Sequence, residues 1–295
     1  MTAFTAYRYR PPIRVPGAYV DVPIEAYHGQ PCDGPSVSST GLKRVLRSPA
    51  HYFARSPLNP NRAEDQRSDA LDLGQAAHCA ALEPDAFEER HVVCPFDSYR
   101  SKDAQAWKAE MHEAGKLILT EEQRSTVFAM AAELRRHPIA LALFRGGVAE
   151  LTFAAKDEPT GLWTLARPDF CPAAAERGLV DYKTAADASP ESFGKAAFNY
   201  GYEVQVALAL ETVERATGER RPTFWMVVQE KEPPFAVAVY EWTPEQITWG
   251  RRKMRDALDI LAGCIERGVW PGYSTDPQPL SAPVWINKQI EAEAA

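Results

Sequence analysis

The sequence predicts an α/β domain in which a central mixed sheet carries helices on both faces, elaborated by an N-terminal helical region. Two features of the apolar pattern predict this class: the spacing is helical before Gly147, and later runs alternate between strand-like and helical spacing. The composition agrees, because 295 residues with 45% hydrophobic and 25% charged side chains are typical of a globular protein. Disorder, collagen and a coiled coil are therefore excluded.

The N-terminal third is predicted to be irregular at first and helical afterwards. Residues 1–35 are rich in Pro and Tyr and are predicted to be irregular. The segment GPSVSSTGLKRVLRSPAHYF offers Ser and Thr caps before its apolar positions and a stop at Pro49, so it predicts a short helix. The segment DALDLGQAAHCAALEP has helical spacing that places His78 on the inward face. Residues 101–114 and 120–136 predict two more helices.

The chain after Gly147 predicts strands and two long helical segments. The runs VAELTFAA and LWTLARPDF are β-rich and are separated by the turn-forming KDEPTG, which predicts an antiparallel hairpin, and GLVDYKT follows as a third strand. Residues 189–218 are helical, with a break near Gly201. The strands TFWMVVQE and FAVAVYEW come next, and residues 244–268 predict a long amphipathic helix.

Charge and cysteine content exclude several classes of protein. The five cysteines are scattered without a C-x-x-C spacing, so neither a disulfide framework nor a cysteine zinc site is predicted. The net charge of −7 is not that of a protein that coats nucleic acid, although residues 1–68 carry nine basic against five acidic side chains. No run of about 18 apolar residues occurs, and the start lacks an apolar signal core. We therefore expect a cytoplasmic protein without a membrane span.

One pair of neighbouring strands carries the residues that predict chemistry. In GLVDYKT, Asp181 and Lys183 project to one face and Tyr182 to the other. Asp169 ends the preceding strand, so two carboxylates meet at one edge of the sheet, where they suit Mg²⁺ or Mn²⁺. Lys183 beside such a metal orients a water and offsets charge on a phosphoryl group. The pattern predicts metal-assisted cleavage of phosphodiester bonds.

Each of these residues alone has a simpler interpretation. An Asp-x-Lys on a strand is usually a solvated or salt-bridged face. A single histidine such as His78 is more often part of a core, and Gln205 alone is usually a surface or capping residue. The order helix His, strand Asp, strand Asp-x-Lys, helix Gln favours the site.

Several longer segments carry a family resemblance. They are SVSSTGLKRVLRSPAHYF, LDLGQAAHCAALEP, GLWTLARPDF, GLVDYKTAADASPESFGKAAFNYGYEVQ and WPGY, and with their surroundings they extend from about Tyr27 to Tyr273. Together they resemble the PD-(D/E)XK nuclease superfamily, in the RecB-like branch that contains exodeoxyribonuclease VIII of the RecE type. The resemblance implies a restriction-endonuclease-like core over residues 36–273, between an N-terminal segment of residues 1–35 and a C-terminal tail of residues 274–295.

The resemblance also implies roles for individual residues. His78 matches a histidine that helps to bind the metal, and Asp169 matches the aspartate of the PD element. Asp181 and Lys183 match the acid and the lysine of (D/E)XK, and the backbone carbonyl of Tyr182 is implied as a further metal ligand. Because Mg²⁺ prefers oxygen ligands, a histidine here predicts greater tolerance of Mn²⁺.

Two features near this motif need a separate interpretation. Gln205 matches the glutamine of the family's Q-x-x-x-Y helix, but Ala209 stands where the tyrosine belongs. The substrate contact or packing of that tyrosine is therefore in question, while no metal ligand is lost. Glu150, at the start of the first hairpin strand, is either a further acidic site residue or a solvated strand end, and we favour the strand end.

DNA contacts are predicted at the short N-terminal helix. Five residues at its start and along it can hold phosphates through backbone N–H groups and positive charge, or they are an N-cap and solvated basic side chains: Ser38, Ser39, Lys43, Arg44 and Arg47. Both interpretations stay open. Phe198, Tyr200 and Tyr202 near the site either stack on a base or belong to the core.

The resemblance implies a metal-dependent deoxyribonuclease using Mg²⁺, with Mn²⁺ as an alternative. It further implies 5′ to 3′ exonuclease action on double-stranded DNA ends in phage or prophage recombination, a ring-shaped homo-oligomer and a partner recombinase that anneals the exposed strand. Two alternatives remain. One is a structure-specific or single-strand RecB-like nuclease, and the other is a noncatalytic DNA-binding protein that keeps the fold.

Overall fold

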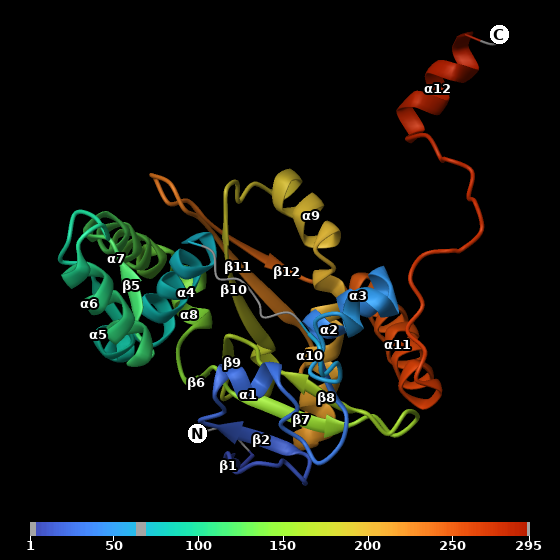
Figure 1. The fold of residues 1–295 in the computed structure, drawn as a ribbon, viewed down its shortest axis with the longest axis horizontal. Helices are drawn as coiled ribbons and strands as arrows, with labels where there is room; N and C mark the ends of the chain where they lie inside the picture. The colour runs from blue at the N-terminus through green and yellow to red at the C-terminus, as the bar shows by residue number, and fades with distance from the viewer. Residues whose placement is uncertain (1–3, 63–68, 294–295) are drawn as a thin grey trace.

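The structure is a computed structural model that describes residues 4–62 and 69–293 (Figure 1). Its helices are α1 Ile24–His28, α2 Ser39–Arg47, α3 Pro49–Phe53, α4 Asp69–Leu82, α5 Phe87–Arg90, α6 Lys102–Glu113, α7 Glu121–Arg136, α8 Pro138–Leu143, α9 Pro190–Asn199, α10 Tyr202–Thr217, α11 Pro244–Arg267 and α12 Val284–Glu293. Its strands are β1 Ala6–Arg8, β2 Gly17–Val20, β3 Ser36–Ser38, β4 His91–Val93, β5 Leu117–Leu119, β6 Gly147–Ala149, β7 Thr152–Lys156, β8 Trp163–Ala166, β9 Phe170–Pro172, β10 Leu179–Ala185, β11 Phe224–Glu230 and β12 Val237–Glu241.

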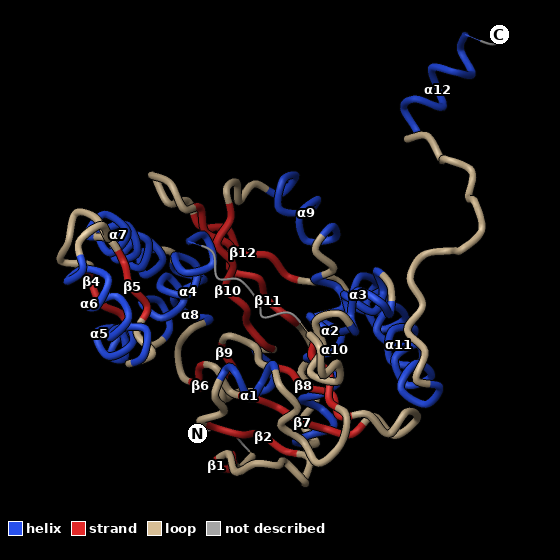
Figure 2. Tube along the Cα trace, viewed as in Figure 1, coloured by secondary structure: helices blue, strands red, loops and turns tan. Residues whose placement is uncertain are grey.

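The strands form two five-stranded sheets and a small pair. One sheet has the order β12-β11-β10-β9-β6, with β10 and β11 parallel and the other pairs antiparallel. The other has the order β1-β2-β7-β8-β3, and β4 pairs with β5. The predicted α/β class with a mixed sheet flanked by helices is therefore confirmed. The expectation that one sheet contains all these strands is wrong, because the predicted hairpin is divided between two sheets (Figure 2).

A bent hairpin joins the two sheets. The parts of the hairpin far from its turn are β6 and β9, which belong to one sheet. The parts next to the turn are β7 and β8, which belong to the other. The pairing has one continuous register, since Ala149 lies opposite Phe170 and Phe153 lies opposite Ala166. At the bend, Glu150 has a φ of 52° and its N–H donates to the Asp169 carbonyl over 3.1 Å. Each of the two hairpin strands therefore passes from one sheet to the other at an acidic residue, which is Glu150 in the first strand and Asp169 in the second.

The N-terminal segment is part of the second sheet. Residues 4–35 were expected to be irregular, but they include β1, β2 and α1, and β2 pairs antiparallel with β7. Ala18 and Tyr19 are buried there. These strands are only three and four residues long, and a pairing with a strand more than 130 residues later leaves no local periodicity to detect.

Helices cover both faces of the sheet that contains β10. Val180 and Tyr182 belong to a core cluster with residues of α4 and α7, whereas Leu179 belongs to a cluster with residues of α9 and α10. Figure 1 shows these helix groups on opposite sides of β10 and β11. The prediction that Tyr182 faces away from its two neighbours is confirmed, and the Asp181 and Lys183 side chains lie on the α10 side.

The helices on the α10 side are tied together by a third core cluster. It includes Leu42 and Val45 of α2, Val204 of α10 and Leu258 of α11. The predicted break near Gly201 is confirmed, because α9 ends at Asn199 and α10 starts at Tyr202. The break brings the N-terminus of α10 beside α2, so that Lys43 of α2 and Lys183 of β10 both approach the Tyr202 ring.

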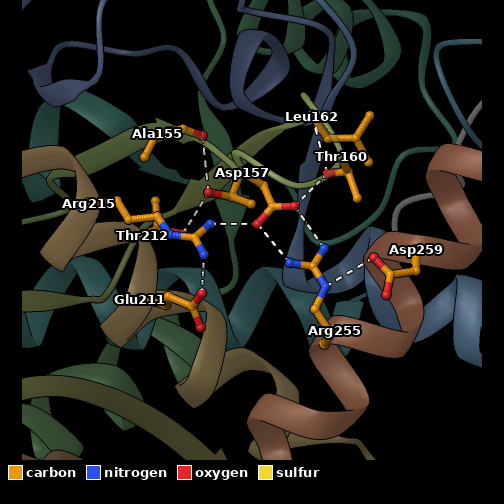
Figure 3. A network of polar contacts seen from close by, with 10 residues as sticks. Ala155, Asp157, Thr160, Leu162, Glu211, Thr212, Arg215, Arg255 and Asp259 are labelled. Carbon is orange, nitrogen blue, oxygen red and sulfur yellow. Dashed lines mark hydrogen bonds and ion pairs between the residues drawn. The ribbon is translucent and has the colours of Figure 1, made fainter.

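A buried ion-pair network fixes the tip of the hairpin (Figure 3). Asp157 is fully buried; its Oδ1 lies 2.6 Å from Arg215 of α10, and Arg255 of α11 donates to both of its oxygens over 2.9 and 2.7 Å. Thr160 donates to it as well. Burial alone would raise the pKa of Asp157, but the bonds from Arg255, Thr160 and Arg215 outweigh it and hold that pKa well below its usual range.

The C-terminal tail leaves the body of the molecule. After α11 the chain is extended, and it ends in α12, which Figures 1 and 2 show apart from both sheets. Its Trp285 is 62% exposed. Within the described ranges, no helix has the length and apolar character needed to span a membrane.

Candidate active site

The site lies between the C-terminal half of α4 and the residue that precedes β9. His78 of α4 has its Nδ1 3.4 Å from Oδ2 of Asp169, and the same carboxylate oxygen accepts the Tyr182 N–H over 2.6 Å. The rings of His78 and Tyr182 lie 4.9 Å apart. The backbone of β10 therefore orients Asp169 toward the histidine.

Glu150 belongs to this site, and its interpretation as a solvated strand end is wrong. Ligand atoms of His78, Glu150 and Asp169 all lie within 4.8 Å of one another. Glu150 stands opposite Asp169 in the register of the bent hairpin, so both side chains project to the same side. Counting back from the centre of the predicted turn, residues 156–161, would pair residue 150 with Arg167 instead, so the predicted turn alone did not give this pairing.

Asp181 is held beside this group by two partners. Its Oδ2 lies 2.5 Å from the Lys183 nitrogen, and its Oδ1 accepts a hydrogen bond from the Gln205 amide over 3.1 Å. The side chain of Asp181 is 1% exposed, and its Oδ2 accepts no hydrogen bond from the described residues. A buried carboxylate oxygen with an ion pair as its single partner is suited to a cation.

The electrostatics of the cluster favour a divalent cation. Burial and the charge of Asp181 raise the pKa of Asp169, and burial is the main reason why the pKa of Glu150 rises to about 7. Burial and Lys183 lower the pKa of His78 to about 4, so its imidazole is neutral near pH 7. Three acidic groups that repel one another and a neutral imidazole form a donor set that Mn²⁺ accepts and Mg²⁺ tolerates.

Lys183 remains positively charged in this setting. Burial would lower its pKa, but the charges of Asp181 and Asp169 outweigh burial and raise it. A lysine of this kind donates hydrogen bonds and balances negative charge, and it does not accept protons near pH 7.

The structure places some of the predicted DNA-contact residues near the site and others away from it. Ser39 lines a small cavity together with Gln205, and Lys43 has its nitrogen 5.3 Å from the Tyr202 ring centre, close to Lys183. Burial and the nearby Lys183 lower the pKa of Lys43 to about 8. The Ser38 side chain makes no capping bond.

The other two basic residues of α2 lie in its last turn. They are Arg44 and Arg47, and Arg47 donates to the Tyr273 hydroxyl over 3.5 Å. Neither residue lines the cavity beside Gln205.

The cavity contains two residues that the sequence pattern did not indicate. Tyr27 and Arg167 line it, with the guanidinium carbon 4.5 Å from the tyrosine ring centre. Ala209 lines the same cavity, one helical turn beyond Gln205. Ala209 stands where the family has a tyrosine, and Tyr27 from α1 lines the same cavity.

Three solved structures are similar to this chain, and one of them has a TM-score above 0.5. The crystal structure of a "Putative exonuclease" from Eubacterium rectale is similar with a TM-score of 0.57 and 15% identity, covering 89% of this chain and 97% of that one. The alkaline exonuclease LHK-Exo from Laribacter hongkongensis is 16% identical with a TM-score of 0.23, over 75% of this chain and 93% of that one. Its complex with dAMP is 15% identical with a TM-score of 0.25, over the same shares. No curated protein matches.

A family model gives the assignment. The family described as "PDDEXK-like domain of unknown function (DUF3799)" matches residues 38–280, which is most of the chain. The predicted PD-(D/E)XK core is thereby confirmed, and the chain belongs to this PDDEXK-like family.

Proposed function

We propose that the protein is a metal-dependent deoxyribonuclease that hydrolyses phosphodiester bonds. One observation carries this proposal: a cluster of His78, Glu150 and Asp169 lies beside a buried Asp181 whose ion-pair partner is Lys183. Acidic donors for a divalent cation next to a fixed positive charge are suited to metal-assisted cleavage of a phosphodiester.

The residues divide into a metal-binding group and a group that acts on water and substrate. His78, Glu150, Asp169 and Asp181 would hold Mg²⁺ or Mn²⁺, together with the backbone carbonyl of Tyr182. When bound, the cation supplies Lewis-acid stabilisation of the phosphate and lowers the pKa of water.

Lys183 and Gln205 act on the other side of Asp181. Lys183 orients the attacking water and balances the charge that grows on the phosphate. Gln205 keeps the Asp181 carboxylate in place through its 3.1 Å bond. Ser38, Ser39, Lys43, Arg44 and Arg47 are proposed to contact the phosphates of the DNA strand.

The finer part of the proposal concerns substrate and context. We infer exonuclease action from 5′ to 3′ on double-stranded ends, in recombination of phage or prophage DNA. A homo-oligomeric ring and a strand-annealing recombinase partner belong to the same inference. The RecE-type resemblance of the quoted segments supports these statements.

Digestion of labelled DNA tests the proposed activity. We expect the protein to degrade an end-labelled linear duplex from its 5′ ends with Mg²⁺ or Mn²⁺, to leave closed circular DNA intact, and to be inactive in EDTA. Asp181→Asn should be inactive under all conditions. Nicking of circles would favour a structure-specific nuclease instead, and DNA binding without cleavage in any metal would leave a noncatalytic binding protein.

Loss of Glu150 should weaken metal binding in the absence of DNA. We expect Glu150→Gln to raise the dissociation constant for Mn²⁺ by at least about tenfold, because removal of one negative ligand lowers the attraction of the site. Isothermal titration of the DNA-free protein with MnCl₂ measures it. The matched control is Glu158→Gln, an exposed residue of the same hairpin that should bind Mn²⁺ like the wild type. If both variants bind Mn²⁺ with equal affinity, Glu150 is not a ligand of the metal.

A further inference from the structure

The turn between α9 and α10 places an exposed aromatic ring near the proposed site. Tyr200 is 65% exposed, and its ring centre lies 5.9 Å from that of Tyr202. Gly201 between them has a φ of 66°, in the region that favours glycine. A Cβ at Gly201 would lie 3.1 Å from the Lys43 side chain, so the stem of that lysine lies against the turn.

A short series of contacts leads from Asp181 to this ring. Asp181 pairs with Lys183, the Lys183 nitrogen lies 5.4 Å from the Tyr202 ring centre, and Tyr202 contacts Tyr200. Lys43 approaches the same Tyr202 ring at 5.3 Å. A phosphate held by these two ammonium groups would therefore have its sugar and base close to Tyr200.

The charges around the turn are asymmetric. On the α2 side lie Lys43 and, along the same helix, two arginines. On the α9 side, a surface hollow is lined by Tyr200 with the acidic residues Asp187 and Glu191, and Lys195 within it is paired with Glu191 at 2.7 Å. A polyanionic backbone is repelled by the acidic side and attracted by α2. The strand would thus direct its bases toward Tyr200.

The neighbouring aromatic residue, Phe198, packs against the protein and is less accessible than Tyr200. Phe198 is 43% exposed and packs edge-on against Trp242, with ring centres 5.6 Å apart, which gives it a structural role. Tyr200 lies against Tyr202 and leaves most of its surface to solvent. The sequence alternative that Tyr200 belongs to the core is therefore wrong.

We propose that Tyr200 is a stacking surface for a nucleobase of the substrate strand next to the cleaved phosphate. The proposal rests on the deoxyribonuclease function above and adds a determinant of substrate specificity to it. A base inside a duplex has both faces covered by its neighbours, so stacking on Tyr200 requires a terminal or unpaired nucleotide. Such aromatic contacts add affinity without dependence on base identity.

Fluorescence of 2-aminopurine tests the stacking directly. The probe is placed at the 5′ end of a single-stranded oligonucleotide and of a linear duplex, and binding is measured with Ca²⁺ in place of Mg²⁺ by anisotropy and by quenching. We expect Tyr200→Ala to raise the dissociation constant about tenfold and to lose the quenching, and Tyr200→Phe to retain both. Tyr7→Ala is the matched control, because Tyr7 is 49% exposed on β1.

The outcomes separate this inference from the proposed function. Unchanged affinity and quenching in Tyr200→Ala, with wild-type protein that cleaves DNA in Mg²⁺, would overturn the stacking role alone. Absence of cleavage by the wild type in every metal would overturn the nuclease proposal. A loss of affinity in Tyr200→Ala that Tyr200→Phe does not restore would point to the hydroxyl and contradict stacking.

Discussion

Replacing Lys183 by methionine is expected to lower the rate of DNA cleavage by about a hundredfold to a thousandfold. The substitution keeps an unbranched side chain of similar length but removes the positive charge that lies 2.5 Å from Asp181. Loss of one preorganised group that stabilises charge in a transition state has an effect of about this size. Initial rates of nucleotide release from a linear duplex, with saturating Mg²⁺, measure it.

Two further variants make the result specific to Lys183. Lys195→Met removes an exposed lysine of α9 and should cleave like the wild type. Lys183→Arg keeps the charge and should retain more activity than Lys183→Met. A Lys183→Met protein with a wild-type rate would show that Lys183 has no part in cleavage. The melting temperature of Lys183→Met shows whether a lower rate comes from a folded protein.

The second large effect concerns stability, at the tip of the bent hairpin. We expect Asp157→Ala to reduce the free energy of unfolding by about 3 to 5 kcal/mol, because removal of one member of a buried ion pair leaves the opposite charge without its partner. Arg215 and Arg255 are 30% and 31% exposed and keep Glu211 and Asp259 as partners, which favours the lower value. Urea denaturation monitored by circular dichroism measures the difference.

The pH dependence of this difference has a defined sign. The folded-state pKa of Asp157 is depressed, so its contribution to stability is present above the unfolded pKa of about 3.9 and is lost as the pH falls below it. The gap between wild type and Asp157→Ala should therefore narrow in acid. Asp259→Asn, at a 59% exposed side chain, should change stability by less than about 1 kcal/mol. An Asp157→Ala protein as stable as this control would contradict the role of the network.

Local signals in the sequence were sufficient for most helices and for the site's central motif. The short helix at α2, the break at Gly201 and the opposite orientation of Tyr182 are confirmed, because helical spacing of apolar residues, glycine conformation and strand alternation depend on near neighbours. His78 was placed inward by helical spacing and lies beside Asp169.

What the sequence did not reveal depends on distant pairing. The N-terminal strands β1 and β2 are too short for a detectable period, and their partner β7 lies far along the chain. Glu150 was misjudged because the strand run hid a residue with positive φ at which the hairpin bends. A bend between two sheets is a tertiary feature, and nothing in the alternation of VAELTFAA marks it.

The bent hairpin also restricts how this chain can vary in length. Its two strands share one register on both sides of the bend, and Glu150 faces Asp169 only in that register. Inserting or deleting one residue between Ala149 and Thr152 would turn the following side chains to the opposite face of their sheet. The same holds between Ala166 and Phe170. Functional relatives are therefore expected to substitute residues in these two crossings and to confine insertions and deletions to other parts of the chain.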